Sequence, residues 1–321
     1  MTSISVSTNP LLQVLSQNVQ TRGASTFLTH MESGKVLTYA DVLAVAEKLT
    51  LILDAHKVAK KARVAFVIRN HWLVYPLLIA CSARRATLVP LDPDLHRDEL
   101  AFILEDCSPS LTIILDRVEL PKYSGQKPSV VLSEVLKSLD ASPQAQALDG
   151  GEADDVNLMI YTSGTTGTNK CVTLTSGNLT SNAQALAARY EVLSSDRFWC
   201  MLPTHHMNAL MITGLVPFVA GASVYLSDIL SFKNAKLFWQ NMEDHQVTIC
   251  SLVPSIMALL LKIFPKGQDV KGAKVRFGFC GAAPLSAPTW KDFEEVFGFP
   301  IYQGYGLTET TCWAVSIPIT G

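Results

Sequence analysis

Short apolar runs alternate with amphipathic stretches along most of the chain. The runs have the length of buried strands, and they are Val64–Ile68, Thr87–Val89, Leu111–Leu115, Val130–Leu132, Asn157–Thr162, Arg197–Leu202, Ser223–Leu226, Val247–Leu252 and Val275–Cys280. Helical periodicity marks the stretches Tyr39–Ala55, Trp72–Ala83, Arg97–Asp106, Ser176–Tyr190 and Pro254–Leu261. Strands and helices in alternation predict βαβ units, and therefore an α/β fold of mostly parallel sheets flanked by helices.

One stretch of the chain, residues 138–154, has no apolar period. It is rich in Ala, Gln, Ser, Gly, Glu and Asp, a composition typical of a surface linker. A length of 321 residues fits one large domain or two smaller ones. We therefore predict an N-terminal α/β lobe over residues 1–150 and a second α/β lobe over residues 151–321.

The overall charge and the apolar segments exclude some functions. A formal net charge of -2 provides no broad basic field, so we do not expect a nucleic-acid partner. The polar N-terminus, Met1–Asn9, does not resemble a secretory signal. Ala209–Leu226 carries no charge, but Gly214, Pro217 and Gly221 interrupt it. We expect a buried helix followed by a buried strand there, and no membrane span.

The seven cysteines are scattered, and none forms a CxxC pair. An odd number of cysteines in apolar surroundings is typical of reduced, buried thiols, so we expect a cytoplasmic protein. A catalytic cysteine is the alternative, although no partner residue stands beside any of the seven.

The segment after the predicted strand Asn157–Thr162 has the composition of a phosphate-binding loop. From residue 161 to residue 170 it is Tyr-Thr-Ser-Gly-Thr-Thr-Gly-Thr-Asn-Lys. Gly164 and Gly167 permit backbone N–H groups to approach an anion, and Lys170 adds a positive charge. Hydroxyl groups that could donate to phosphate oxygens belong to Thr162, Ser163, Thr165, Thr166 and Thr168. A hydroxyl-rich surface turn is the alternative.

This loop is not a P-loop of the GxxxxGK[ST] type. Asn169 stands where that pattern requires glycine, and Cys171 stands where it requires a hydroxyl for magnesium. The loop closely resembles the signature YTSGTTGxPKG of the adenylate-forming superfamily, which contains acyl-CoA synthetases, adenylation domains of peptide synthetases and beetle luciferases. The chain departs from that signature at Asn169, in place of proline, and at Cys171, in place of glycine. Both departures favour a reduced affinity for ATP.

A second segment, Tyr302–Glu309, resembles the YGxTE element of the same family. An aromatic face at Tyr305 suits adenine, and Thr308 can donate to the α-phosphate. Glu309 offers a hard oxygen ligand for Mg²⁺. The resemblance also implies close contact between the nucleotide and Gln303, Gly304 and Gly306.

Two further segments resemble family elements. Phe277–Leu285 contains a turn of small residues, Gly281, Ala282 and Ala283, which in the family lies along the adenine and the acid pocket. An ordinary strand-to-turn transition is the alternative.

Leu202–Asn208 resembles the P-x-F-H element, with His206 in the position of the histidine near the substrate carboxylate. A metal pair with His205 is disfavoured, because adjacent side chains seldom point the same way. A histidine without catalytic role is the other alternative.

The resemblance implies an acid–thiol ligase that uses ATP and Mg²⁺ to convert a small carboxylic acid to an acyl adenylate. The catalytic residues would be Lys170, His206, Thr308 and Glu309, with coenzyme A or the phosphopantetheine of an acyl carrier protein as acceptor. The element after His205 has no aspartate for a substrate ammonium, which favours an aryl or aliphatic acid. Residues expected at the acid are His206, Met207, Asn208, Gly281, Gly304 and Trp313.

Two other functions remain open from the sequence. One is the amino-acid adenylation domain of a peptide synthetase, and the other is a non-catalytic nucleotide-binding module. Family members are usually longer than this chain, and they end in a small domain with a catalytic lysine that has no counterpart here. We therefore expect an N-terminal fragment that binds ligands and turns over little.

Overall fold

The computed structural model describes residues 8–141, 145–148, 150–163, 169–266 and 274–317. The chain packs into two units, of which the first contains residues 1–25 and 37–181 and the second contains residues 26–36 and 182–321. The predicted domain boundary at residue 150 stays a prediction.

The first unit is built on a six-stranded sheet in the order β6-β5-β3-β4-β7-β8. Its strands are β3 (Arg63–Val67), β4 (Thr87–Leu91), β5 (Leu111–Ile114), β6 (Ser129–Val131), β7 (Val156–Ser163) and β8 (Asn169–Thr175). Every pair is parallel except β7 with β8, which is an antiparallel hairpin. The hairpin joins this sheet because Leu158 of β7 pairs with Leu88 of β4.

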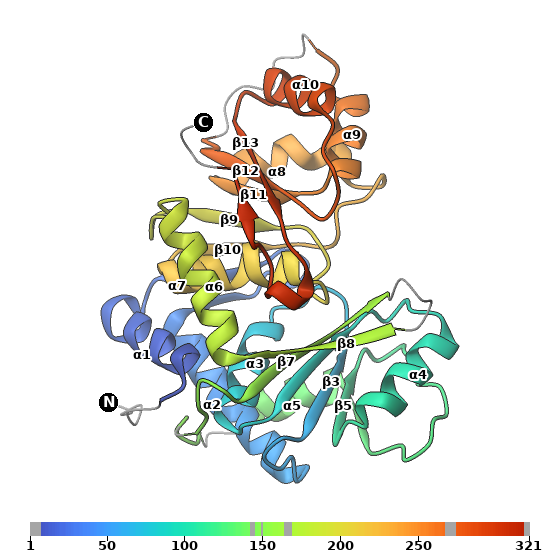
Figure 1. The fold of residues 1–321 in the computed structure, drawn as a ribbon. Helices are drawn as coiled ribbons and strands as arrows, with labels where there is room; N and C mark the ends of the chain where they lie inside the picture. Colours follow the sequence, from blue (N-terminus) through green and yellow to red (C-terminus); the bar gives the residue numbers. More distant parts are fainter. Residues whose placement is uncertain (1–7, 142–144, 149, 164–168, 267–273, 318–321) are drawn as a thin grey trace. The chain divides into compact units, whose positions relative to one another are not determined.

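Helices cover both faces of this sheet (Figure 1). They are α1 (Pro10–Arg22), α2 (Tyr39–Ala55), α3 (Val74–Ala83), α4 (Arg97–Cys107) and α5 (Leu132–Ala141). The chain leaves β3 toward β4 on one side and reaches β5 on the other side, so right-handed crossovers place α3 and α4 on opposite faces. The core under α4 contains Ala65, Val67, Val89 and Leu91 from the strands and Leu100, Ile103, Leu104 and Cys107 from the helix.

The second unit is built on an eight-stranded sheet in the order β14-β13-β12-β11-β9-β10-β1-β2. Its strands are β1 (Thr26–His30), β2 (Val36–Thr38), β9 (Arg197–Cys200), β10 (Ser223–Leu226), β11 (Ile249–Leu252), β12 (Phe277–Cys280), β13 (Ile301–Tyr305) and β14 (Val315–Ser316). Neighbouring strands from β1 to β13 are parallel, and β14 is antiparallel to β13. The α/β class with mostly parallel sheets is thus confirmed.

The remaining helices lie in the second half of the chain. They are α6 (Ser176–Arg189), the π-helix η1 (Asn208–Leu215), α7 (Val216–Ala220), the 3₁₀ helix η2 (Ala235–Leu237), α8 (Phe238–Asp244), α9 (Pro254–Ile263), α10 (Ala287–Phe297) and the 3₁₀ helix η3 (Thr308–Thr310). The uncharged stretch 209–226 forms η1, α7 and β10, as expected of buried helix and strand. In the described parts of the chain, no helix has the length and hydropathy needed to cross a membrane.

A buried carboxylate fixes the amino ends of the central strands in the second unit. The side chain of Asp196, directly before β9, is 2% exposed. Its oxygens accept hydrogen bonds from Thr248 Oγ1 (2.8 Å), just before β11, and from the Leu193 backbone N–H (2.7 Å). The guanidinium of Arg276, just before β12, completes the set. One carboxylate therefore sets the relative positions of three parallel strands.

We predict that Asp196→Ala lowers the free energy of unfolding by about 3 kcal/mol, because it leaves a partly buried guanidinium and two donors without their acceptor. The midpoint of urea denaturation measures the change. Asp292→Ala, which removes a solvent-exposed partner of Lys266, is the matched control and should shift the midpoint far less. Equal shifts of the midpoint for the two variants would show that Asp196 stabilises the fold no more than a solvent-exposed carboxylate does.

Candidate functional site

The predicted phosphate loop joins the two strands of the β7–β8 hairpin. Thr162 and Ser163 end β7, Lys170 lies near the start of β8, and Thr162 pairs with Lys170 across the hairpin. The Lys170 side chain is exposed to solvent. Gly164, Thr165, Thr166 and Gly167, together with Thr168, lie outside the described residues. The hairpin nevertheless places the lysine and the hydroxyl of Thr162 beside each other at the base of the loop.

Two hydrogen bonds attach this hairpin to α4. The Tyr161 hydroxyl donates to Asp106 Oδ2 (2.5 Å), and Asn169 Nδ2 donates to Glu99 Oε1 (2.8 Å). Burial, and then the hydrogen bond to Asp106, raise the pKa of Tyr161 far above its usual range, so the hydroxyl stays protonated as the donor. Proline has no side-chain donor, so Asn169 provides an anchor that the family signature lacks.

Some of the residues expected at the nucleotide belong to the second unit, and two strand ends bring most of these together. Cys280 of β12 pairs with Gln303 of β13, which sets the turn after β12 beside the end of β13. The two ends border an open pocket of about 680 Å³, lined by Ala282, Ala283, Pro284, Gln303, Gly304, Tyr305, Gly306, Leu307, Val315, Ser316 and Ile317. Tyr305 is 65% exposed, so its ring face is available to a flat ligand.

The indole of Trp313 occupies the space above two glycines at this edge. A Cβ atom at Gly304 would lie 2.0 Å from Trp313 Cδ2, and one at Gly281 would lie 3.1 Å from Trp313 Nε1. The indole is 6% exposed and packs edge to face on Phe279, with ring centroids 5.2 Å apart. Trp313 is therefore a core residue that also limits the room behind both glycines.

Thr308 and Glu309 lie on the short helix η3, just beyond the pocket. Thr308 is half-buried and Glu309 is exposed. The turn that follows contains Thr311 at φ +71°, a conformation that is costly for a β-branched residue. Ala282, on the pocket rim, is likewise at φ +69°. Backbone strain thus occurs next to both of these candidate segments.

The predicted metal site depends on Glu309 alone. Within the described residues, no three His, Cys, Asp or Glu side chains gather into a metal-binding cluster. Magnesium that arrives with a nucleotide needs only one or two protein carboxylates, because phosphate oxygens and water supply its other ligands. A single exposed carboxylate next to this pocket fits that mode of binding.

The two adjacent histidines follow β9. Their rings lie 4.4 Å apart at an angle of 60°, with His205 half-buried and His206 exposed. The His206 backbone N–H donates to the Pro203 carbonyl (3.0 Å), which forms a tight turn after the strand. Among the described side chains no further metal ligand joins the pair, so the exposed imidazole of His206 remains the candidate for the substrate carboxylate.

The residues after His206 are held by two contacts that sequence reasoning missed. The thiol of Cys312 approaches the Met207 carbonyl oxygen (3.9 Å), and the Ser251 hydroxyl donates to Asn208 Oδ1 (3.0 Å). Both partners are small polar groups in apolar surroundings, and in the sequence nothing distinguishes them from core residues. These contacts fix Met207 and Asn208 near Trp313 and the end of β11.

The described cysteines are all free, and only Cys171 is exposed. Burial raises the pKa of Cys280 and of Cys312 to about 12. Both groups beside the candidate site are therefore protonated thiols at neutral pH, and neither is a nucleophile. This argues against the alternative of a catalytic cysteine at this site.

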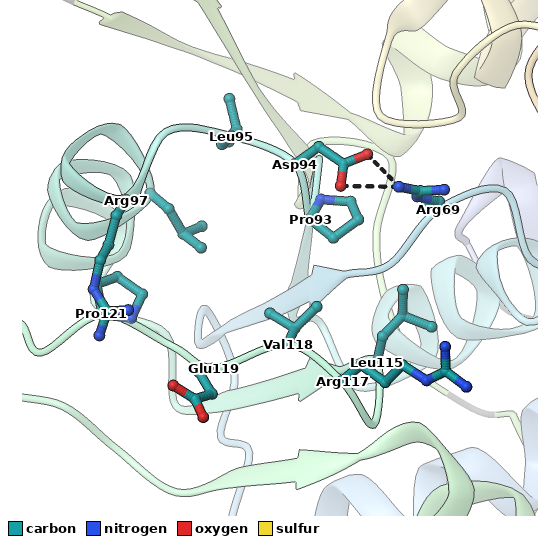
Figure 2. A pocket seen from close by; sticks show the side chains of 11 residues that line it. Arg69, Pro93, Asp94, Leu95, Arg97, Leu115, Arg117, Val118, Glu119 and Pro121 are labelled. Carbon is teal, nitrogen blue, oxygen red and sulfur yellow. Dashed lines mark hydrogen bonds and ion pairs between the residues drawn. The ribbon is translucent and has the colours of Figure 1, made fainter.

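Sequence reasoning also missed an arginine-lined pocket of about 510 Å³ in the first unit, which we call the arginine pocket. Its lining comes from the segments that follow β3, β4 and β5, and comprises Arg69, Pro93, Asp94, Leu95, Arg97, Leu100, Leu115, Arg117, Val118, Glu119 and Pro121 (Figure 2). Its position could be found from the sequence only by noting that arginines follow two predicted strands.

The sheet topology explains why a pocket forms there. From β3 the chain passes to β4, whereas from the neighbouring β5 it passes to β6 on the opposite side. Crevices at such a switch point, beyond the carboxyl ends of the strands, are where open α/β sheets bind ligands. Arg69 Nη2 donates to both carboxylate oxygens of Asp94, at 2.9 Å to Oδ1 and 2.6 Å to Oδ2. Neither Arg97 nor Arg117 forms an ion pair with any residue that the structure describes.

Comparison with known proteins assigns the family. The model of the AMP-binding enzyme family matches residues 15–321. The chain belongs to the AMP-binding enzyme family. The sulfoacetate–CoA ligase of Cupriavidus necator is 30% identical over 303 residues, which are 91% of this chain and 58% of that protein. The 2-succinylbenzoate–CoA ligase of Bacillus subtilis is 26% identical over 88% of this chain and 56% of that protein.

Solved structures show the same fold for this AMP-binding enzyme. The N-terminal domain of FACL13 from Mycobacterium tuberculosis superimposes with a TM-score of 0.86 over 96% of this chain and 78% of that chain, at 24% identity. The ATP-bound MatB of Rhodopseudomonas palustris superimposes with a TM-score of 0.83 over 98% of this chain and 62% of that chain, at 21% identity. The chain spans a little over half the length of the curated relatives it matches.

We predict that Gly304→Ala destabilises this AMP-binding enzyme by about 2 kcal/mol, because the new methyl group overlaps the Trp313 ring. In a double-mutant cycle, Gly304→Ala should cost little in a Trp313→Ala background, which gives a coupling energy above about 1 kcal/mol. Thermal melts of the four proteins measure it. Gly281→Ala, whose closest approach is longer, is the control, and additive effects would show that the ring does not occupy this space.

Proposed function

We propose that the chain is the part of an ATP-dependent acid–thiol ligase that binds ATP and the acid and forms the acyl adenylate. The observation that carries the proposal is the pocket between Ala282–Pro284 and Gln303–Leu307, in a chain of the AMP-binding enzyme family. Glycine backbone, an exposed aromatic ring and the adjacent Thr308 and Glu309 give this pocket the groups that a nucleotide needs.

In the proposed reaction, a carboxylate oxygen of the acid attacks the α-phosphorus of ATP. A new bond forms between that oxygen and phosphorus, the bond from the α-phosphorus to the bridging oxygen breaks, and pyrophosphate leaves with the electron pair. Catalysis of this step is mainly positioning and neutralisation of charge. The backbone N–H groups of the loop and Lys170 would hold the β- and γ-phosphates.

The other roles fall to residues of the second unit. Thr308 donates to the α-phosphate, and the imidazole of His206 orients the carboxylate before attack. Glu309 would hold the Mg²⁺ that accompanies ATP, and the ion would neutralise phosphate charge. The carboxylate needs no proton removed near neutral pH, so the site requires no general base for this step.

We further propose that the acceptor is coenzyme A and that the arginine pocket binds its phosphates. Coenzyme A carries a 3′-phosphate and a pyrophosphate, and guanidinium groups bind such oxygens with two parallel hydrogen bonds. Arg97 and Arg117 are exposed, and neither is engaged by a described carboxylate. The curated relatives described above are named as CoA ligases, which supports coenzyme A over a carrier protein.

The acid and the cellular location are also proposals. An aryl or short aliphatic acid suits a site that has Trp313 behind its glycines and no aspartate beside His206. A cytoplasmic location is supported by seven unpaired cysteines, because oxidising compartments favour disulfides. Since the relatives are longer, we propose that full turnover needs residues beyond those of this chain.

Thermal stabilisation tests the adenylate site directly. ATP with Mg²⁺ and the acyl sulfamates of adenosine, which are stable mimics of acyl-AMP, should each raise the melting temperature. A ligand at roughly 100 times its dissociation constant stabilises the folded state by about 2.7 kcal/mol. Stabilisation by aminoacyl analogues alone would favour a peptide-synthetase domain, and no shift with any ligand would contradict the proposal.

We predict that Glu309→Gln raises the Kd for ATP about tenfold in Mg²⁺, since one charged metal ligand is lost. In excess EDTA the variant and the wild type should bind ATP equally. Lys170→Ala should have a smaller effect, because backbone donors of the loop remain. Glu295→Gln, on the exposed side of α10, is the control. Isothermal titration measures all four proteins, and an effect of Glu309→Gln that persists in EDTA would remove the metal role.

For the arginine pocket, we predict that Arg117→Ala and Arg97→Ala each raise the Kd for coenzyme A about tenfold, because each removes a charge-assisted contact. For 3′-dephospho-CoA, at least one variant should bind as the wild type does, which identifies the arginine that contacts the 3′-phosphate. Arg276→Lys, in the second unit, is the charge-conserving control. Unaltered coenzyme A affinity in both alanine variants would show that its phosphates bind elsewhere.

A further inference from the structure

Within the described residues, only one of the two polar atoms of the Asn208 amide has a hydrogen-bond partner. Its Oδ1 accepts the hydrogen bond from the Ser251 hydroxyl at 3.0 Å. Its Nδ2 is buried, yet it donates to no atom of the residues that the structure describes. Buried donors in native proteins nearly always have an acceptor, so an unpartnered one needs an explanation, such as a ligand or an ordered water. Because Ser251 holds the oxygen end, the free end is a donor.

This amide lies on the same face of the sheet as Trp313. Ser251 of β11 is in register with Phe279 of β12, and paired residues of neighbouring strands project to the same face. The Trp313 indole packs edge to face on Phe279, and the Cys312 thiol contacts the Met207 carbonyl. Asn208 and the indole therefore border the same region of this face. Asn208 is two residues after His206 in the sequence.

The local helix type supports a role in binding. Asn208 is the first residue of the π-helix η1, a geometry that is rare and is frequently found at functional sites. An ordinary core position at the start of a buried helix would favour an apolar residue, since a free amide donor there is destabilising. The sequence instead has asparagine there, and the Ser251 hydroxyl fixes its amide in one orientation.

We propose that Asn208 Nδ2 donates a hydrogen bond to an uncharged oxygen, a hydroxyl or a carbonyl, on the acyl chain of the substrate. The substrate class is then a short hydroxy- or oxo-acid, whose length Trp313 limits. The oxygen is uncharged because the residues named on this face, Met207, Ser251, Phe279, Cys312 and Trp313, are all neutral, and a second carboxylate would be buried among them without a cation. This inference rests on the proposed adenylate site, because it names the acid that the site takes.

The test compares matched acyl sulfamates of adenosine that differ by one oxygen. The series contains the butyryl compound, its 2-, 3- and 4-hydroxy isomers, its 3-oxo form, and the succinyl compound with a second carboxylate. In the wild type, at least one hydroxy or oxo compound should bind tenfold or more tightly than the butyryl compound, which is the preference expected of a site that would otherwise leave a buried donor unpaired. Isothermal titration of the chain gives each Kd.

Two variants connect that preference to the amide. In Asn208→Ala, the ratio of the butyryl Kd to the Kd of the best hydroxy or oxo compound should fall to about one. Ser251→Ala keeps the amide but removes the bond that orients it, so the ratio should fall partway. If Asn208→Ala does not fold, the ratio of Kd values measured for Ser251→Ala tests the role of the amide instead.

Each outcome decides the proposal separately from the proposed function. If the butyryl compound binds but no hydroxy or oxo compound binds better, the adenylate site stands and the role of Asn208 is overturned. A preference that persists in Asn208→Ala, or a succinyl compound that binds best, overturns it as well. If Asn208→Ala weakens all compounds equally, the amide contacts the activated carboxyl group and not the acyl chain. If no compound binds, the adenylate site itself fails.

Discussion

Parallel pairing of strands is the constraint from which both candidate sites follow. When neighbouring strands run in one direction, all of their carboxyl ends meet at one edge of the sheet, and the loops that leave that edge converge. In the second unit, the segments after β9, β12 and β13 carry the histidines, the small-residue turn and the Thr308–Glu309 helix. In the first unit, the segments after β3, β4 and β5 form the arginine pocket. In each unit, residues far apart in the sequence become neighbours because the strands before them are parallel.

The two edges of the second sheet are built in opposite ways. At the amino edge, Asp196 is enclosed, its acceptor oxygens are filled by Thr248, Leu193 and Arg276, and the strand starts are fixed. At the carboxyl edge, glycine backbone and an exposed tyrosine ring border an open pocket, and the buried Nδ2 of Asn208 has no acceptor among the described residues. Rigid positioning at one edge permits an open, polar arrangement at the other, because the strands themselves hold the loops in place. This is the arrangement expected of a preorganised site, in which the scaffold and not the ligand orders the groups.

Much of the fold could be predicted from the sequence, because the central strands are buried on both faces and therefore form continuous apolar runs. The predicted helix Tyr39–Ala55 begins and ends where α2 does, since Thr38 caps it with Asp41. The strands β8 and β13 could not be predicted in this way, because phosphate-loop and glycine-rich residues replace the apolar pattern there. The strands β1, β2 and β14 were missed as well, because their few residues mix apolar and polar side chains. The family motifs pointed to the segments that line the pocket after β12 and β13, whereas the arginine pocket depends on strand order, which periodicity does not contain. The partner of Asn208 lies 43 residues away on another element, so no local signal could have indicated its half-satisfied amide.

Several departures from stable local structure in the second unit lie near the carboxyl edge of its sheet. Ala282 and Thr311 adopt positive φ angles, Gly304 accommodates an indole where a side chain would stand, and the Asn208 amide lacks an acceptor. Each of these features reduces stability on its own, and a chain selected only for folding would replace them at small cost. The rest of the sheet must hold these residues in place, as the Asp196 hydrogen bonds and the aromatic packing around Phe279 do. Backbone strain and an unsatisfied donor at the same edge of the sheet together support ligand contact there more strongly than either feature does by itself.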